Sequence, residues 1–333
     1  MKITYFYRNP QCGFSIQRVF QTLTNEIEKY AEVEEAFVPS KRSLPWDVII
    51  NCIFVFKNRN KTGINHITGH IHETILALLG LKTVVTIHDL VFLDNVRNPF
   101  KKFYKWLFWL YLPLKLSDKV VCISTETKRR ILTHMNSDKL SVIYNSIDDS
   151  FSFSEKEFNE DKPLILHIGT SWNKNLSRTI QALEGISCHL RIIGEINETQ
   201  LAALKKHKIE YSNAFSLSDE EIKQEYINCD LINFPSEYEG FGMPIVEGQK
   251  TGRVVITSKI EPLIEVSGNA VAYVDPLSVK SIRDAYLEVI KHQEIREKII
   301  RDGLKNTARF EVAVIAQQYI DLYKTLKPLG IKS

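Results

Sequence analysis

Short runs of β-branched and other apolar residues alternate along this chain with longer stretches in which apolar positions recur every three or four residues. The short runs fit strands that are buried on both faces, and the longer stretches fit amphipathic helices. Regular alternation of the two predicts an α/β fold with parallel sheets covered by helices. The predicted strands are residues 3–7, 47–51, 64–67, 83–87, 119–123, 140–144, 163–168, 189–193, 230–234, 253–257 and 271–274.

The same rhythm starts twice, which indicates two domains. Residues 146–162 are polar, lack a long apolar period and precede a clear buried strand, so we place the boundary near residue 155. The length of 333 residues also suggests two domains, at roughly 100 to 200 residues for each. In open parallel sheets, ligands bind beyond the carboxyl ends of the strands. We therefore expect two doubly wound domains that face each other across a cleft, with the chemistry in that cleft.

Composition and charge narrow the class of protein. The chain is 44% hydrophobic and 25% charged, which is typical of a globular protein and excludes disordered and collagen-like classes. A net charge of +3 is too small to argue for a nucleic acid as partner. The charge is unevenly spread, because residues 1–150 hold 20 basic and 14 acidic side chains and the remainder holds 23 and 26. The basic excess therefore belongs to the first half.

The cysteines and the apolar runs bear on location. The five cysteines are far apart, without a C-x-x-C pair, and fit free thiols in a reducing compartment. The apolar start of the chain is too short for a signal peptide. The longest nearly uncharged run, residues 106–114, is far below the roughly 20 residues of a membrane-spanning helix. We expect a cytoplasmic protein.

The most informative stretch is residues 234–247, FPSEYEGFGMPIVE, which follows a predicted strand and opens a helix. Gly240 and Gly242 allow a tight turn and a close approach of the backbone to a ligand, and Pro244 suits the first helical turn. The unpaired amides at such a helix start bind phosphate. The stretch therefore predicts an anion site.

Two carboxylates flank this helix start. Glu239 lies in the loop and Glu247 one turn inside the helix, so they can contact different parts of one extended ligand, such as a sugar nucleotide. In the alternative interpretation, Ser236 and Glu239 form an S-x-x-E capping box and Glu247 complements the helix dipole. The two glycines directly after Glu239 argue against a helix that begins there.

The segment from Glu239 to Glu247 resembles the E-x7-E signature of retaining glycosyltransferases with the GT-B fold, in particular the large family 4. Other segments resemble family elements in the same order: TVVTIHDL at 83–90, VCISTET at 121–127, VIYNSID at 142–148, EVSGNA at 265–270 and VDP at 274–276. The resemblance covers nearly the whole chain. It implies a Rossmann-like acceptor domain in residues 1–155, a Rossmann-like donor domain in 156–309, and a C-terminal helix in 310–333 that returns to the first domain.

The resemblance also implies roles for individual residues. Glu239, with the amides of Gly240 and Phe241, is expected to hold the donor sugar, and Glu247 the ribose hydroxyls. Lys174 is expected to stabilise the leaving diphosphate. The residues implied in catalysis are Glu239, His88 and Lys174, and those implied in donor binding are Glu247, Gly240, Phe241, Gly242, Gly169 and Asn173.

His88 directly follows an apolar strand, which predicts a ring at the strand's carboxyl end, where Asp89 can orient it. By position alone a single histidine is more often structural, but the family's histidine at this place contacts the donor sugar.

Lys174 follows another strand and a glycine, where an ammonium can offset charge that develops on a diphosphate. A single loop lysine is more often only solvated. The family has an Arg-Lys pair here, and this chain has Asn173 in place of the arginine. Either Lys174 carries the diphosphate alone or an arginine elsewhere substitutes.

The first strand is followed by QCGFSIQ, with one glycine where many relatives have two. We predict that Gly13, Phe14 and Ser15 form a loop that approaches phosphate or acceptor. An ordinary turn between a strand and a helix explains the same residues almost as well.

Three histidines, His66, His70 and His72, cluster near Glu73 and raise the question of a metal site. Their place at a strand end that runs into a helix fits the lining of an acceptor cleft better. The sequence has no Asp-x-Asp motif, which commonly marks a metal-bridged diphosphate in nucleotide-sugar enzymes. We expect metal-independent transfer without a cofactor, and with a nucleoside diphosphate sugar as co-substrate.

Residues 97–130 hold nine lysines and arginines but only two acidic residues, and seven aromatic residues lie among them. A basic, aromatic-rich helix can lie in a membrane interface and attract anionic lipid. It can equally be a core helix whose lysines reach out to water. Many proteins of the family use lipid-linked acceptors, which favours peripheral contact with the inner face of a membrane.

The sequence thus predicts a retaining glycosyltransferase that acts on a glycan or lipid-linked acceptor in the assembly of bacterial-type surface polysaccharide, lipopolysaccharide or glycolipid. One alternative is a GT-B nucleotide-sugar epimerase, which needs no second substrate. Another is a catalytically silent module that binds a nucleotide sugar or a glycan, which Asn173 favours and the glutamate pair opposes. The first half is the expected acceptor domain and carries the basic excess, so we expect an anionic or membrane-borne acceptor.

Overall fold

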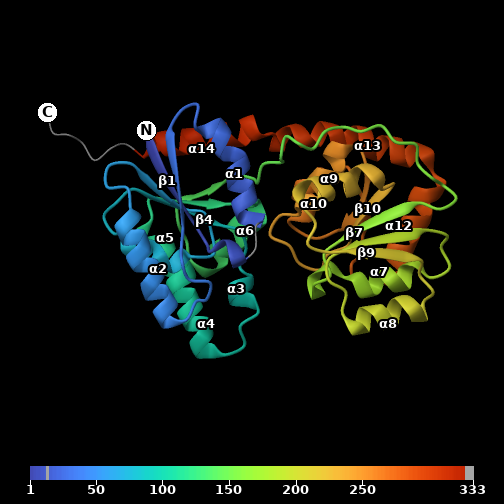
Figure 1. The fold of residues 1–333 in the computed structure, drawn as a ribbon, viewed down its shortest axis with the longest axis horizontal. Coiled ribbons are helices and arrows are strands. Elements are labelled where there is room, and N and C mark those ends of the chain that lie inside the picture. The colour runs from blue at the N-terminus through green and yellow to red at the C-terminus, as the bar shows by residue number, and fades with distance from the viewer. Residues whose placement is uncertain (13–14, 327–333) are drawn as a thin grey trace. The chain divides into compact units, whose positions relative to one another are not determined.

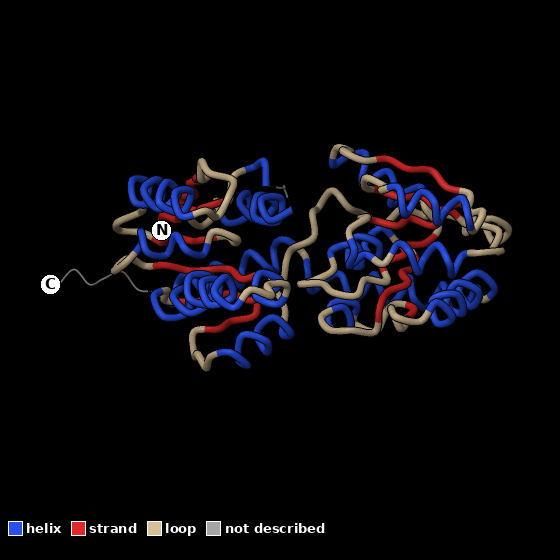
Figure 2. Tube along the Cα trace, turned by 90° about the horizontal axis from the view of Figure 1, so that it is seen from below, coloured by secondary structure: helices blue, strands red, loops and turns tan. Residues whose placement is uncertain are grey.

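The computed structural model describes residues 1–12 and 15–326. Contacts divide the chain into two units: Met1–Asp148 with the described part of Phe310–Ser333, and Asp149–Arg309. Each unit is a six-stranded parallel sheet between helices (Figure 1). Figure 2 shows the strands of each unit lying between helices on both faces. The predicted α/β class with two doubly wound parallel sheets is confirmed.

The first sheet has the strand order β2-β1-β3-β4-β5-β6, and every neighbouring pair is parallel. Its order reverses between β1 and β3. The strands are β1 (Lys2–Tyr7), β2 (Glu32–Phe37), β3 (Ile64–Ile67), β4 (Thr83–Ile87), β5 (Lys119–Cys122) and β6 (Leu140–Val142). The helical segments of this unit are η1 (Pro10–Cys12), α1 (Ser15–Ile27), α2 (Pro45–Asn58), η2 (His72–Leu78), α3 (Val91–Asp94), α4 (Pro99–Lys105), η3 (Trp106–Tyr111), α5 (Leu112–Leu116), α6 (Thr125–His134) and α14 (Val312–Thr325).

The second sheet has the order β12-β11-β10-β7-β8-β9, again with parallel neighbours, and reverses between β7 and β10. Its strands are β7 (Leu164–Ile168), β8 (His189–Ile193), β9 (Tyr211–Ala214), β10 (Leu231–Phe234), β11 (Val254–Ser258) and β12 (Ala272–Val274). Its helical segments are η4 (Trp172–Lys174), α7 (Leu176–Leu183), α8 (Glu198–Lys206), α9 (Asp219–Asn228), α10 (Met243–Thr251), α11 (Leu263–Ser267), α12 (Val279–Lys291) and α13 (Gln293–Thr307), and η5 (Ala308–Phe310) spans the boundary between the units.

One predicted strand is wrong, and two strands were not predicted. Residues 47–51 belong to helix α2, whose apolar residues lie on both its buried and its exposed faces, so the sequence shows no helical period. The strands that were not predicted are β2, an edge strand of the first sheet, and β9, an edge strand of the second. Each has polar, partly exposed residues instead of a buried apolar run.

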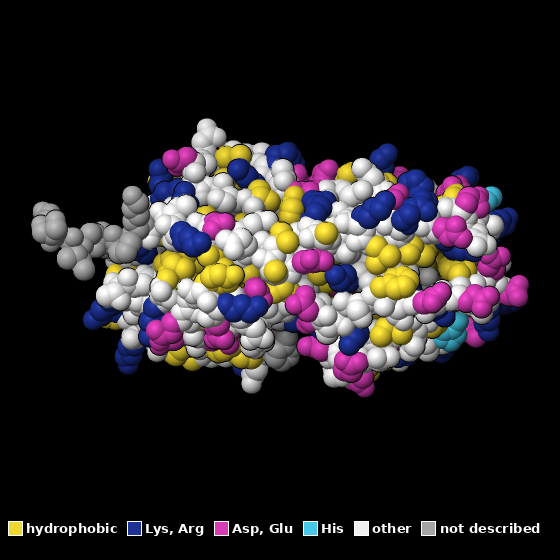
Figure 3. All heavy atoms as spheres, turned by 90° about the horizontal axis from the view of Figure 1, so that it is seen from above, with side chains coloured by type: hydrophobic (Ala, Val, Ile, Leu, Met, Phe, Trp, Pro, Cys, Tyr) yellow, Lys and Arg dark blue, Asp and Glu magenta, His cyan; other side chains and the backbone are white. Residues whose placement is uncertain are grey.

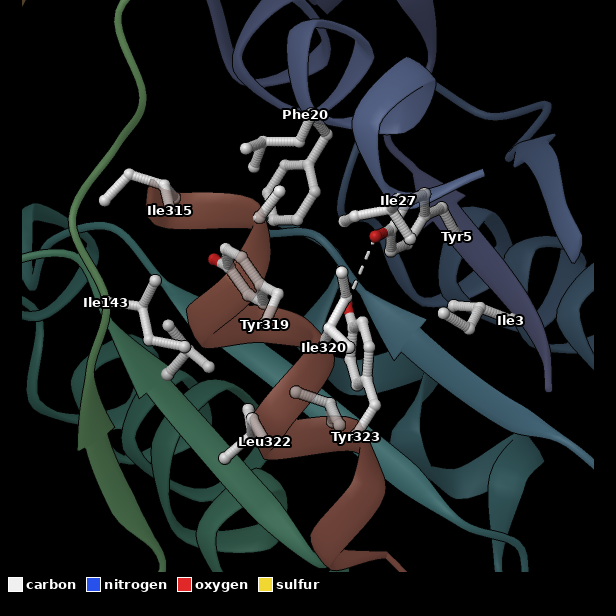
Figure 4. Close-up of a cluster of buried hydrophobic side chains, with 14 of the residues drawn as sticks. Ile3, Tyr5, Phe20, Ile27, Ile143, Ile315, Tyr319, Ile320, Leu322 and Tyr323 are labelled. Atoms are coloured by element: carbon white, nitrogen blue, oxygen red, sulfur yellow. Dashed lines mark hydrogen bonds between the residues drawn. The ribbon is translucent and has the colours of Figure 1, made fainter. Parts of the chain in front are cut away.

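The C-terminal helix α14 completes the core of the first unit (Figure 4). Tyr319 packs against Phe20 of α1 with the ring centroids 5.8 Å apart. Tyr323 places its hydroxyl 3.2 Å from the Tyr5 hydroxyl and 2.7 Å from His66 Nδ1. Burial lowers the pKa of His66 to about 3, so the ring is neutral at pH 7. Helix α14 is therefore anchored to β1 and β3 by polar as well as apolar contacts.

The surface shows no segregation of charge on the face drawn in Figure 3, where Lys and Arg side chains mix with Asp and Glu. Among the described residues, no helix has the length and apolar content that crossing a bilayer requires.

Removal of the Tyr323 hydroxyl should destabilise the protein. Tyr323→Phe leaves the ring in place but leaves His66 Nδ1 and the Tyr5 hydroxyl short of a buried partner, which costs about 1–3 kcal/mol. Urea denaturation followed by circular dichroism measures this as a lower midpoint. Tyr30→Phe, at an exposed tyrosine, is the matched control and should change stability by less than about 0.5 kcal/mol. Equal midpoints for both variants would contradict the assigned anchor.

Candidate active site

The residues predicted to hold the donor gather where the second sheet reverses its strand order. Strands β7 and β10 are parallel neighbours, so their carboxyl ends lie side by side. This switch point is the place where doubly wound sheets bind ligands. Residues 169–175 leave β7 there, and residues 235–242 leave β10. The two loops therefore meet at one edge of the sheet.

The central contact is an ion pair between the two loops. Lys174 Nζ lies 2.5 Å from Glu239 Oε1, and the two side chains are only 21% and 13% exposed. Lys174 Nζ also lies 4.7 Å from the centroid of the Phe234 ring at the end of β10. Partial burial strengthens such a contact over that of a surface pair. The structure brings together an ammonium and a carboxylate that the sequence could only place separately.

Asn173 links the same two loops. Its amide Nδ2 donates to the Tyr238 carbonyl at 2.9 Å and lies 3.4 Å from Glu239 Oε1. The backbone carbonyl of Asn173 accepts a hydrogen bond from the backbone amide of Glu237 at 2.8 Å. Asn173 therefore shapes the loop that carries Glu239.

A third loop is joined by Asn175, which the sequence reasoning missed. Asn175 is buried, has a left-handed backbone (φ 61°), and its Nδ2 donates to the carbonyls of Pro235 at 3.0 Å and Pro276 at 2.7 Å. These prolines lie just beyond β10 and β12. Asparagine tolerates the left-handed region better than most residues, which was the available signal.

Two glycines permit the close packing of this edge. Gly169 has φ +91°, and a Cβ there would lie 2.8 Å from Lys174 Cγ. Gly242 has φ +107°, and a Cβ there would lie 2.7 Å from Leu263 Cδ2. Gly242 is also the N-cap of α10, so this helix begins at Met243. The alternative capping box of Ser236 and Glu239 is wrong, because no helix starts in that part of the loop.

Glu247 lies in α10, beyond the glycine turn, and is half-buried. Its Oε2 accepts a hydrogen bond from the hydroxyl of the buried Tyr226 at 2.5 Å. Gly240 and Phe241 complete the turn between Glu239 and α10, and Phe241 is buried. The two glutamates thus flank the amino end of α10, as the spacing predicted.

In the first unit, His88 follows β4 directly and is buried. Its Nε2 lies 2.8 Å from the Thr68 carbonyl, which can only accept, so the proton is on Nε2. Burial lowers the pKa of His88 to about 4, and the ring is neutral at pH 7. Gly69 is needed here because a Cβ would lie 2.6 Å from His88 Cδ2. Asp89, expected to orient the ring, accepts from the Val91 amide with Oδ1.

A cavity of about 190 Å³ lies beyond the ends of β1, β2 and β3, next to the switch point of this sheet. Its basic lining comes from Arg8, Lys41 and Arg42. Glu73 also lines it, and burial raises the pKa of this carboxyl to about 7. The indole Nε1 of the buried Trp109, another lining residue, has no hydrogen-bond partner among the described residues. The cavity offers several donors to a polar or anionic group.

Of the three clustered histidines, two lie in the core and one lines the cavity. His66 contacts Tyr323 and the Thr86 hydroxyl with its two ring nitrogens, and His72 contacts the carbonyls of Trp109 and Thr86. Both are fully buried, so their predicted role in lining an acceptor cleft is wrong. His70 does line the cavity. Residues 1–12 and 15–326 contain no group of three His, Cys, Asp or Glu side chains placed to hold a metal ion.

Residues 97–130 are not one helix. They span α4, the π-helical turn η3, α5, β5 and part of α6. Trp109 is buried in this segment, as expected of a core helix, whereas Phe100 and Phe103 are exposed. Contact with a membrane stays a prediction. The predicted glycine loop lies mostly outside the described residues: Gly13 and Phe14 are not described, and Ser15 is the first residue of α1.

Substitutions at Asn175 should separate its two contributions. Asn175→Gly keeps the left-handed backbone but leaves two carbonyls unpaired, and Asn175→Ala adds backbone strain of about 1 kcal/mol. Denaturant unfolding should therefore rank the wild type above the glycine variant and the glycine variant above the alanine variant. Asn269→Gly, at an exposed asparagine with the same φ of 61°, is the control and should change little. A glycine variant as stable as the wild type would show that the side-chain bonds are dispensable.

Two family models match this chain, one in each half. The model described as Glycosyltransferase Family 4 matches residues 21–151, and the model described as Glycosyl transferases group 1 matches residues 148–306. The chain is 30% identical over 226 residues to the O-antigen chain mannosyltransferase RfbU of Salmonella typhimurium. That match covers 64% of this chain and 62% of the relative, so the chain spans less than two thirds of the relative's length.

Solved structures show the same fold. The Anabaena protein HepE, in complex with UDP and glucose, superposes with a TM-score of 0.78 over 98% of this chain and 100% of its own, at 14% identity. The sucrose-phosphate synthase of Thermosynechococcus elongatus gives 0.81 over 98% and 99%, at 13% identity. At such identities these structures show the fold alone. Together with the two family models, they confirm the resemblance seen in the sequence: each half of the chain matches a glycosyltransferase family model, and the chain is GT4-like with the GT-B fold.

Proposed function

We propose that this protein transfers a sugar from a nucleoside diphosphate sugar to a hydroxyl of a glycan or lipid-linked acceptor, with retention at the anomeric carbon and without a metal ion. The observation that carries the proposal is the contact between Lys174 and Glu239 beside the amino end of α10. A carboxylate for sugar hydroxyls, an ammonium and helix amides for a diphosphate are the groups that such a donor needs.

The donor is held by the second unit in this proposal. Glu239, with the amides of Gly240 and Phe241, binds hydroxyls of the donor sugar. Lys174 binds the diphosphate and stabilises the charge that develops on it as the bond to the anomeric carbon breaks. Its position beside Glu239 supports this assignment, because sugar and diphosphate are adjacent in the donor. Glu247 accepts hydrogen bonds from the ribose hydroxyls.

The remaining donor residues act by position. Gly169 allows the Lys174 side chain to lie against the backbone after β7, and Gly242 allows α10 to begin close to the ligand. Asn173 holds the loop that carries Glu239. We assign these three to the donor site on that basis.

The first unit supplies the acceptor side in this proposal. His88 is neutral and donates through Nε2, so its Nδ1 is left to accept a hydrogen bond from a hydroxyl of the donor sugar. The cavity beside Arg8 and His70 takes an anionic part of the acceptor, since three basic side chains line it.

The wider role follows from the relatives. RfbU is named for the O-antigen chain, and we infer a comparable role in bacterial-type surface polysaccharide or lipopolysaccharide assembly. The enzyme then works in the cytoplasm at the inner face of the membrane. Residues 97–130 contribute to membrane contact through Phe100 and Phe103, which are exposed beside Lys101 and Lys102.

The two glutamates should differ in their effects. Glu239→Ala should reduce kcat by at least a hundredfold in a protein that still folds, with a somewhat lower urea midpoint because the variant breaks the partly buried ion pair with Lys174. Glu247→Ala should raise the donor Kd about ten- to a hundredfold, because hydrogen bonds to a charged group contribute about 1.5–3 kcal/mol.

Thermal shift with UDP-, GDP- and ADP-sugars identifies the donor before these variants are tested, since a ligand that binds only the native state raises Tm.

The control for these variants is Glu220→Ala, at an exposed glutamate of α9, which should leave transfer and donor binding unchanged. Full activity of Glu239→Ala would refute the assigned site. No Tm shift with any donor would refute donor binding itself.

Retention and metal independence have their own test. With an α-linked donor, NMR of the product should show an α linkage, and transfer should persist in EDTA. A β-linked product would refute retention. Loss of transfer in EDTA that added Mg²⁺ or Mn²⁺ restores would refute the assignment of diphosphate stabilisation to Lys174 and the α10 amides alone.

A further inference from the structure

Helix α2 presents an apolar stripe that no other described element covers. Its outward side chains recur at the spacing of one helical face and are between 46% and 75% exposed: Trp46, Ile49, Ile50, Ile53 and Phe56. Leu44, the N-cap, extends the stripe and is 56% exposed. In Figure 1, α2 lies on the outside of the first unit. Single exposed apolar residues are ordinary, but a continuous row on one helix indicates an interaction site.

The opposite face of α2 packs against the core of the first unit. Asn51 and Val55 are buried there, and Val55 belongs to the core that also contains Ile75 of η2. The Asn51 side chain accepts from the Ser40 amide at 3.0 Å. The helix is thus held from one side, and its outward residues can be changed without touching this core.

Basic residues flank the stripe at both ends. Lys41 and Arg42 precede α2, and Lys57, Arg59 and Lys61 lie at or just after its end. Between residues 41 and 61, the only acidic side chain is Asp47. An apolar face with a basic rim and an aromatic residue is typical of a helix that lies in the interface of an anionic membrane.

We propose that α2 docks this protein on an anionic lipid bilayer, with Trp46, Ile49 and Ile53 in the interface and the flanking cations among the headgroups. This inference rests on the proposed function for the location at a membrane, and it deepens that proposal by naming α2, a surface outside the donor site, as the principal contact.

A second copy of the chain is the less suitable occupant. Fourteen residues make a helix about 21 Å long, and a face about 10 Å wide offers roughly 200 Å². Stable protein interfaces bury about 800 Å² on each partner. Five cations around one acidic residue would also repel one another across a symmetric contact, whereas anionic headgroups neutralise them.

Docking by α2 has a consequence that rests on the proposed function. Lys41 and Arg42 line the cavity beside Arg8 as well as preceding α2. A protein held on the bilayer by α2 therefore has the rim of this cavity near the headgroups, where the phosphate of a lipid-linked acceptor lies.

The test uses the full-length protein and vesicles of phosphatidylcholine, with or without phosphatidylglycerol. In flotation, the wild type should bind the vesicles that contain phosphatidylglycerol, and a variant with Ile49→Ser, Ile53→Ser and Phe56→Ser should bind at least tenfold more weakly. Tryptophan emission should shift to the blue on binding, and Trp46→Phe should remove most of that shift.

The matched control carries the same number of changes at exposed apolar residues elsewhere: Leu132→Ser, Phe215→Ser and Val314→Ser. It should bind like the wild type. Phe100→Ser with Phe103→Ser tests the contribution of α4 separately. Urea midpoints and the Tm shift with the donor should be unchanged in the α2 variant, so that failure of docking and failure of donor binding are distinguishable.

Three results would overturn the inference. They are a wild type that ignores both kinds of vesicle, an α2 variant that binds as well as the wild type, and a concentration-dependent dimer in light scattering that the α2 changes dissolve. The last would assign the stripe to a second copy.

Discussion

The edge of the second sheet that we propose as the donor site depends on one buried side-chain amide, that of Asn175, which holds three loops together. It donates to the carbonyls beyond β10 and β12 from its own place beyond β7. Lys174 is the preceding residue, so the position of its ammonium opposite Glu239 follows from this anchor. Lys174 and Glu239 lie on loops, but a buried hydrogen-bonded side chain fixes those loops to the sheet, so the site that we propose is preorganised.

The first unit depends on an analogous constraint made by a remote part of the chain. Tyr323 of α14 reaches β1 through Tyr5 and β3 through His66, and these contacts join residues more than 250 positions apart in sequence. The core on this side of the sheet therefore includes helix α14, which follows the whole second unit in sequence. The second unit, in contrast, is one continuous segment, Asp149–Arg309, with its own core cluster.

Much of the fold was predictable because buried parallel strands are short apolar runs: the predicted residues 64–67, 83–87 and 189–193 coincide with β3, β4 and β8. Edge strand β2 was not predicted because its sequence, EVEEAF, has no such run. Part of helix α2 was predicted as a strand because both faces of the helix carry apolar residues. The glutamates of the signature were found by spacing. Their pairing with Lys174 was not, since the adjacency of β7 and β10 is set by strand order, which local patterns do not contain. Asn175 needed a backbone angle that only the structure shows.

Asn173 stands where the resemblance led us to expect an arginine, and it adds hydrogen bonds but no charge to this edge of the sheet. The Asn173 side-chain amide donates to the Tyr238 carbonyl at the same edge of the sheet. It thereby orders the loop that carries Glu239 and adds no charge. Arg178, in the first turn of α7, donates to Glu237 and to the Asn175 side chain. In the donor site that we propose, Lys174 and the amides of α10 therefore bind the diphosphate without help from Arg178. Because the second half of the chain is acidic overall, donor recognition in this proposal depends on the geometry of these few groups and not on the net charge of the domain.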